Sequence, residues 1–273
     1  TITPRAVAVA ISDGTKVYGA SDPVLGYSIT DGSLVAGDDF SGTPVRVAGE
    51  HVGTYEITQG TLELGPNYAL DITPGSFEIT PATLSVTADS TSRTYGTTNP
   101  VFTYQVTGFQ LGETEGTAAA YGAPVCSSDA TEGSSVAGSP YPITCAGGTA
   151  GDYLFDYTPG DLTITAATLT YDVAVEDKTY DGTTGAGIAS CELVGVFGAD
   201  DVACDASGAT ASFAEPSAGT WTVSVSGLTF TGVDAGNYTA GDTDTTSATI
   251  TPRAVAVAIS DGTKVYGASD PVL

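Results

Sequence analysis

The chain ends by repeating its own beginning. Residues 249–273 are identical to residues 1–25, position by position. Chance does not produce a run of 25 identities, so the chain holds one complete period of 248 residues and the start of the next. Repetition at a fixed period is the sequence signature of a tandem array. The length of 273 residues therefore describes a window onto a repeating chain, and not the size of one domain.

A weaker repeat divides the period into three diverged copies. Each copy has an early basic residue two positions before a tyrosine, a central aromatic residue, a late Asn-Tyr or Asp-Tyr, and a final Ile-Thr. The early pairs are Lys16 and Tyr18, Arg93 and Tyr95, and Lys178 and Tyr180, and the late pairs are Asn67-Tyr68, Asp152-Tyr153 and Asn237-Tyr238. We predict domains over 1–80, 81–165 and 166–250, called here the first, second and third repeats. Residues 251–273 begin the next period and are too few to bury a core alone, so another chain completes them or they fray.

The local pattern is that of β-strands. β-branched and aromatic residues alternate with Thr and Ser, and Gly-containing turns separate the runs. We expect an all-β chain of small Ig-like sandwiches, joined stiffly across Pro81-Ala82 into an elongated rod. The alternative is a β-grasp-like unit with one short helical turn. That turn would lie in the Gly-rich acidic segments 37–39, 112–114 and 198–201.

Charge excludes several classes of partner. Seven Lys and Arg face 32 Asp and Glu, giving a net charge of −25. Such a polyanion does not bind nucleic acid, whose phosphates require cationic side chains. No run of apolar residues is long enough to span a membrane, so this segment is not expected to be embedded in one. The partners that we expect are neighbouring repeats of the same chain and identical chains in a filament.

Four cysteines lie in two of the repeats. Cys126 and Cys145 belong to the second repeat, and Cys191 and Cys204 to the third. Because each pair is close in sequence and lies within one repeat, we predict two disulfides and an oxidising compartment. Aligning the repeats puts Arg46 opposite Cys126 and Gln59 opposite Cys145, which indicates a polar cross-strand pair in the first repeat.

Few residues suggest catalysis or metal binding. His51 is the single histidine and has no counterpart in the other repeats, so we expect a solvated turn residue. We predict that the chain is not an enzyme. The expected cofactor is none, with calcium as the ion that the acidic turns and the stretch 241–244 could bind. The sequence shows no calcium-binding loop and no zinc motif.

The recurring tyrosines and basic residues have structural interpretations. Tyr68, Tyr153 and Tyr238 are expected to be corner tyrosines that pack a ring and bond the backbone. The early tyrosines Tyr18, Tyr95 and Tyr180 are assigned a structural role with them. The early basic residue and the late Asn or Asp are expected to pair electrostatically in each repeat. Such a pairing would join Arg93 to Asp152.

The first two repeats resemble the MBG domains of the YGX type. The motifs that carry the resemblance are Ile-Thr-Pro, Val-Tyr-Gly or Thr-Tyr-Gly, and Asn-Tyr or Asp-Tyr. The third repeat, with Lys-Thr-Tyr-Asp-Gly-Thr-Thr at 178–184, is similar to a YDG domain. Both families occur in tandem in very large bacterial surface proteins, including adhesins. The resemblance therefore implies an extracellular location on a bacterial cell surface.

Two functions remain open at this point. The first is a structural repeat segment of a secreted surface protein, which forms a stiff extracellular stalk, fibre or filament. The second is an adhesive module that binds glycan or a mucin-type glycoprotein. A binding module would expose aromatic residues found in one repeat only, and Phe109, Tyr121 and Phe197 are the candidates.

Overall fold

The computed structural model describes residues 1–243 and 246–271. It divides into two compact units. The first unit contains residues 1–93, 98–131 and 138–163, and the second contains 94–97, 132–137 and 164–273. The repeat boundaries predicted from the sequence stay predictions.

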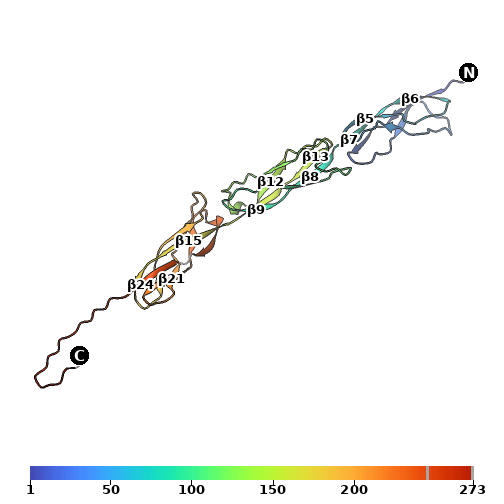
Figure 1. The fold of residues 1–273 in the computed structure, drawn as a ribbon. Coiled ribbons are helices and arrows are strands. Elements are labelled where there is room, and N and C mark those ends of the chain that lie inside the picture. The colour runs from blue at the N-terminus through green and yellow to red at the C-terminus, as the bar shows by residue number, and fades with distance from the viewer. Residues whose placement is uncertain (244–245, 272–273) are drawn as a thin grey trace. The chain divides into compact units, whose positions relative to one another are not determined.

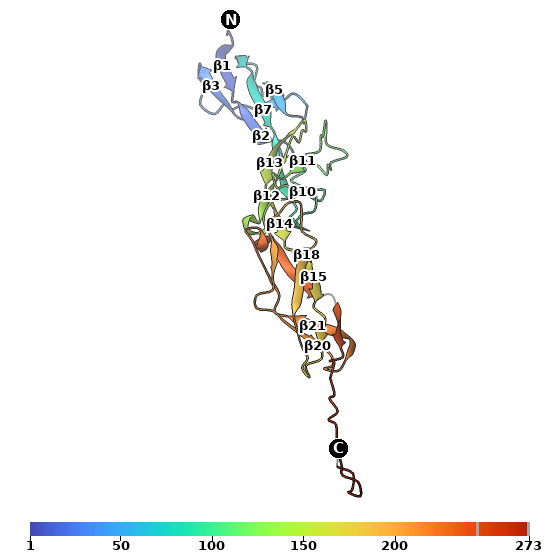
Figure 2. The same ribbon diagram turned by 90° about the vertical axis from the view of Figure 1, so that its left-hand side faces the viewer.

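Two sheets build the first repeat. Its strands are β1 (Arg5–Ile11), β2 (Gly14–Val17), β3 (Tyr27–Asp31), β4 (Val45–Arg46), β5 (Gly53–Thr58), β6 (Tyr68–Thr73) and β7 (Gly75–Thr80). One sheet has the order β3-β1-β6 and the other β2-β7-β5-β4, with β1 beside β3 and β5 beside β7 in Figure 2. β1 runs parallel to β6, and β2 runs parallel to β7.

Alternation along these strands produces the core. In β7 the residues Gly75, Phe77 and Ile79 are buried while Ser76 and Glu78 are exposed. Successive side chains of a strand point to opposite faces, so this pattern places one face of β7 inward. Phe77 and Ile79 pack with Ile11 of the other sheet. Each such side chain contributes about 1.5–3 kcal/mol through burial, which holds the two sheets together.

The second repeat has the same arrangement of two sheets. Its strands are β8 (Ala82–Ala88), β9 (Thr91–Thr94), β10 (Tyr104–Thr107), β11 (Val125–Ser127), β12 (Tyr141–Ala146), β13 (Tyr153–Thr158) and β14 (Gly160–Thr165), with the 3-10 helix η1 (Val136–Gly138). The sheet orders are β10-β8-β13 and β11-β12-β14-β9. β8 runs parallel to β13, as β1 does to β6.

The third repeat is divided into more strands. They are β15 (Ala167–Val175), β16 (Lys178–Thr179), β17 (Gly185–Ala186), β18 (Ile188–Val194), β19 (Ala203–Asp205), β20 (Thr210–Phe213), β21 (Gly219–Ser226), β22 (Thr229–Thr231), β23 (Tyr238–Thr243) and β24 (Thr246–Thr251), with η2 (Ala235–Asn237). The sheet orders are β18-β15-β23, β16-β24-β21-β20-β17 and β19-β22. Phe213, Val223 and Ile250 lie at the centre of its core.

The all-β prediction, with tandem sandwich domains, is confirmed by these sheets. The helical turn of the alternative interpretation does not lie where the sequence suggested. The segments 37–39, 112–114 and 198–201 contain hydrogen-bonded turns, whereas the 3-10 helices η1 and η2 lie elsewhere in the chain. A single acidic side chain can stabilise a turn without starting a helix.

The last described residues, 252–271, are exposed and form no strand (Figure 1). Their sequence is the one that forms β1 and β2 at the start of the chain. The same residues therefore fold where the rest of the repeat follows them. Within the described part of the chain, no helix is long and apolar enough to span a membrane.

Candidate functional site

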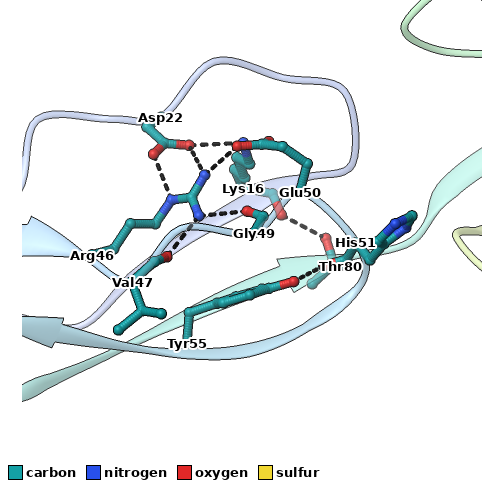
Figure 3. Close-up of polar contacts among 9 residues, drawn as sticks. All are labelled: Lys16, Asp22, Arg46, Val47, Gly49, Glu50, His51, Tyr55 and Thr80. Atoms are coloured by element: carbon teal, nitrogen blue, oxygen red, sulfur yellow. Dashed lines mark hydrogen bonds and ion pairs between the residues drawn. The ribbon is translucent and has the colours of Figure 1, made fainter.

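The first repeat holds a network of two cations and two carboxylates (Figure 3). The Lys16 Nζ atom lies 2.7 Å from Asp22 Oδ1 and 2.5 Å from Glu50 Oε2. Arg46 Nε lies 2.5 Å from Asp22 Oδ2, and its Nη2 lies 2.5 Å from Glu50 Oε1. The side chains of Lys16 and Arg46 are only 4% and 8% exposed, so their charges are neutralised at the edge of the core.

Charge pairing shifts the pKa values of the network in the stabilising direction. Hydrogen bonds from Arg46 and then Lys16 hold the pKa of Asp22 below its usual value. The hydrogen bond from Lys16, followed by that from Arg46, lowers the pKa of Glu50. The hydrogen bond to Asp22 raises the pKa of Arg46, although burial opposes this. All four groups are therefore charged at neutral pH, and each cation has a carboxylate partner.

Arg46 also organises the loop before β5. Its Nη1 donates to the carbonyl oxygens of Val47 and Gly49 at 3.0 and 2.5 Å. Its guanidinium carbon lies 5.2 Å from the ring centroid of Phe77 and 5.6 Å from that of Tyr55. Such cation–π contacts add to the ion pairs. Arg46 therefore joins this loop to the core. Both cations of the network, Lys16 and Arg46, already have carboxylate partners within the chain.

The predicted cross-strand pair of Arg46 with Gln59 is wrong. Arg46 lies opposite Ile57 in the β4–β5 register, whereas Cys126 lies opposite Cys145 in the β11–β12 register. Gln59 instead donates from Nε2 to the carbonyl oxygen of Leu62. The motif alignment was two residues out of register at this strand pair, because short strands carry little information on register.

Both disulfides are present in the structure. Cys126–Cys145 joins β11 to β12, and Cys191–Cys204 joins β18 to β19. They close loops of 19 and 13 residues. The two bridges therefore tie different strand pairs in the second and third repeats.

The late tyrosine of every repeat makes the same two hydrogen bonds. Its hydroxyl accepts from the backbone N–H of the first residue of an acidic turn and donates to the carboxylate three residues later. The partners are Val35 and Asp38 for Tyr68, Gln110 and Glu113 for Tyr153, and Phe197 and Asp200 for Tyr238. Burial raises the pKa of Tyr153 and of Tyr238 to about 12. The acidic turns that the sequence assigned to helix caps or calcium thus serve as the partners of these tyrosines.

The early tyrosines share one backbone contact. The N–H groups of Tyr18, Tyr95 and Tyr180 donate to the carbonyl oxygens of Thr80, Thr165 and Thr251, each at 2.8 Å. Tyr18 and Tyr95 are each 4% exposed, and Tyr180 is 43% exposed. The backbone hydrogen bond of the early tyrosine is therefore the same in the three repeats, whereas its side chain is buried in two repeats and exposed in the third.

The predicted pairing between the early basic residue and the late Asn or Asp is not what the structure shows. Asp152 binds His51, whose Nδ1 lies 2.8 Å from its Oδ2, and accepts from the Val52 N–H at 2.7 Å. Arg93 contacts Asn99 and the Thr131 carbonyl oxygen instead. The His51 side chain is 74% exposed, as a turn residue would be, but its carboxylate partner could not be predicted from the sequence. The hydrogen bond to Asp152 raises the pKa of His51.

Lys178 is held within its own turn. Its Nζ donates to Asp181, to the hydroxyl and carbonyl oxygens of Thr183, and to the carbonyl oxygen of Gly185. The Thr183 N–H, together with Lys178, lowers the pKa of Asp181 to about 2. Lys178, Asp181 and Thr183 of the motif are therefore joined by hydrogen bonds within one turn.

The three aromatic residues considered for ligand binding pack against other aromatic rings of the chain. Phe109 contacts Tyr121 and Tyr153, and Phe197 contacts Tyr95, with ring centroids 5.7–6.0 Å apart. All three candidate aromatics are half-buried. Among the described residues, no group of three acidic, histidine or cysteine side chains could hold a metal ion. Of the acidic stretch 241–244, Asp244 lies outside the described residues.

Comparison with family models assigns the repeats. The model of the MBG domain (YGX type) matches residues 7–78 and again residues 84–163, more than half of the chain. The chain belongs to the MBG domain family. The model of the YDG domain matches residues 165–247, so the third repeat is a YDG domain. The tandem MBG and YDG prediction is confirmed.

Other comparisons add little to this assignment. No curated protein matches the chain. Among solved structures, the crystal structure of the I9–I11 tandem from titin is similar at 9% identity, with 89% of this chain and 96% of that chain covered. The TM-score of 0.22 is too low to support an argument, so the fold rests on the sheets described above.

Proposed function

We propose that this chain is a repeat segment of a very large secreted bacterial surface protein, where it forms a stiff extracellular stalk, fibre or filament. The observation that carries the proposal is the return of residues 1–25 as residues 249–273. An array that repeats a whole period without change adds length and adds no new kind of site. The proposal includes no catalytic role.

Stiffness is supported by the core of the first compact unit. One cluster of buried residues contains Phe77 and Ile79 before Pro81, and Ala82 and Leu84 after it. The same cluster includes Tyr18 and Tyr153, which belong to different MBG repeats. Because buried side chains pack without large voids, a shared core resists bending more than a solvated linker does.

An extracellular location is supported by the two disulfides and by the surface charge. Disulfides persist in oxidising compartments and are rare in reducing ones. A net charge of −25 also opposes the association of exposed sheet edges. The adhesive alternative gains no support, because Phe109, Tyr121 and Phe197 are all engaged in ring contacts inside the described residues.

Electron microscopy of chains that contain one, two and four periods tests the structural role. We expect the contour length to rise in proportion to the number of periods, with little bending between adjacent MBG repeats. Compact particles, or free bending at every joint, would contradict the stalk. Protease treatment of intact cells tests the location, since a surface array loses its repeats while cytoplasmic proteins survive.

A further inference from the structure

One pair of rings recurs between a repeat and the repeat that follows it in sequence. Tyr18 of the first repeat meets Tyr153 edge-to-face, with centroids 5.3 Å apart and planes at 76°. Tyr95 of the second repeat meets Tyr238 in the same way, at 5.4 Å and 81°. In both cases the early tyrosine of one repeat packs on the late tyrosine of the next.

A hydrogen bond accompanies each ring pair. The residue directly before the late tyrosine accepts a backbone N–H from the preceding repeat. Val52 donates to Asp152 Oδ1 at 2.7 Å, and Val136 donates to Asn237 Oδ1 at 2.9 Å. Asp152 and Asn237 are 3% and 6% exposed, which is unusual for these residue types and reflects the contact. The two contacts together form a two-point lock.

Each end of this chain carries one half of the same lock. The third repeat has Tyr180, whose backbone N–H is bonded like those of Tyr18 and Tyr95, but this residue is 43% exposed. Within the described residues no ring contacts it. The third repeat also has Ala218, which is exposed and directly precedes Gly-Thr-Trp, as Val52 directly precedes Gly-Thr-Tyr.

The other half lies in the first repeat. Tyr68 makes both hydroxyl hydrogen bonds of a late tyrosine, to the Val35 N–H and to Asp38, yet no described ring packs on it. Asn67, which corresponds to the buried Asp152 and Asn237, is exposed. The surface around the late tyrosine is therefore covered in the second and third repeats, and the same surface is open in the first repeat.

We propose that the next copy of the first repeat in the continuing chain docks on the third repeat through this lock. Tyr180 packs edge-to-face on Tyr68 of that copy, and the Ala218 N–H donates to the side-chain oxygen of its Asn67. The occupant is identified by residues 249–273, which start that copy directly after β24. In a continuing array the late tyrosine of the following repeat, the equivalent of Tyr68, comes nearly as far after Tyr180 as Tyr153 comes after Tyr18. The inference rests on the proposed function only in requiring that the array continues.

The rate of tyrosine nitration, mapped by mass spectrometry, tests the lock. The 273-residue chain is compared with a chain in which residues 26–80 follow residue 273, so that the next copy is complete. Tyr180 should be nitrated readily in the shorter chain and should lose this reactivity in the longer one. Its rate should fall to that of Tyr18 and Tyr95, which are the buried internal standards. Equal nitration of Tyr180 in the two chains would overturn the proposal.

The repeat itself supplies a matched control variant. In the longer chain, Asn67→Ala in the second copy should restore nitration of Tyr180. The same Asn67→Ala change in the first copy should not. If both variants leave Tyr180 protected, the hydrogen bond is not part of the lock. If Tyr180 becomes protected in the shorter chain as its concentration rises, the partner is a separate chain, and the assignment to the continuing chain fails. A stalk with one hinge per period would survive either failure, so the two proposals are tested separately.

Discussion

The two MBG repeats stabilise the same region of their fold by different chemistry. In the second repeat a disulfide joins β11 to β12 through Cys126 and Cys145. In the first repeat the corresponding pair, β4 and β5, has no covalent bridge, and Arg46 on β4 is held by Asp22 and Glu50. The second repeat therefore has a covalent tie at this strand pair, whereas the first repeat has ion pairs that hold β4 to the adjacent loops. A covalent tie responds to reductant, whereas an ionic tie responds to salt and pH.

The largest effect is expected from removing the covalent tie. Replacing Cys126 and Cys145 together by Ala should lower the free energy of unfolding of the second repeat by about 3 kcal/mol, because the open loop gains conformational freedom in the unfolded state. Hydrogen exchange followed on peptides of each repeat measures this. Peptides that cover the separate cluster of Val7, Val9 and Leu62 in the first repeat are the control and should change least. If reductant and substitution both leave the exchange of the second repeat unaltered, the bridge is not a stabilising tie.

A smaller loss is expected from breaking the ionic tie. Arg46→Met keeps an apolar stem but removes the guanidinium, so Asp22 and Glu50 retain Lys16 alone. We expect a loss of about 2 kcal/mol in the first repeat, less than for a fully buried pair because Asp22 and Glu50 are partly exposed. Arg46→Lys is the matched control, since it keeps the charge but not the planar fork. Added salt should weaken the wild type more than Arg46→Met, which keeps only the Lys16 pairs, and the opposite order would reject an ionic tie.

The smallest effect is expected at His51, where the tie depends on pH. The hydrogen bond to Asp152 raises the pKa of His51 above the ordinary value of 6.5, so the folded chain holds this proton more tightly than the unfolded chain. The stabilisation is fully present below pH 6.5 and is lost as the pH rises through the folded pKa. The difference in urea midpoint between the wild type and His51→Gln should therefore be larger at pH 5.5 than at pH 8.5. A difference in urea midpoint that does not change with pH would show that a charged His51–Asp152 contact does not stabilise the fold.

The sequence predicted what depends on repetition and alternation. The all-β class, the sandwich repeats and both disulfides follow from spacing and from period-two patterns, and the families follow from short motifs that resemble MBG and YDG domains. It also singled out the acidic turns and the late tyrosines, but as separate features. Their hydrogen bond joins residues 30 to 40 positions apart, as between Tyr68 and Asp38. Local pattern does not carry information on such a contact.

The misses have the same origin. The Arg46–Gln59 pairing failed because a two-residue error in register leaves the inward and outward faces unchanged, so alternation could not expose it. The contact of His51 with Asp152 joins residues 101 positions apart across two repeats. Nothing in either neighbourhood marks the other. The sequence would have revealed it only if every repeat kept the same pair, and these repeats vary there.

Parallel pairing of β2 with β7 has a mechanical consequence. β2 lies near the start of the first repeat and β7 at its end, with Lys16 opposite Ile79. The third repeat pairs β16 with β24 in the same sense. Tension applied at the two ends of such a domain pulls parallel neighbours in opposite directions, so their hydrogen bonds are sheared together rather than opened one by one. We expect these domains to unfold at higher force when pulled through their termini than when pulled across β4 and β5, a difference that single-molecule force spectroscopy measures.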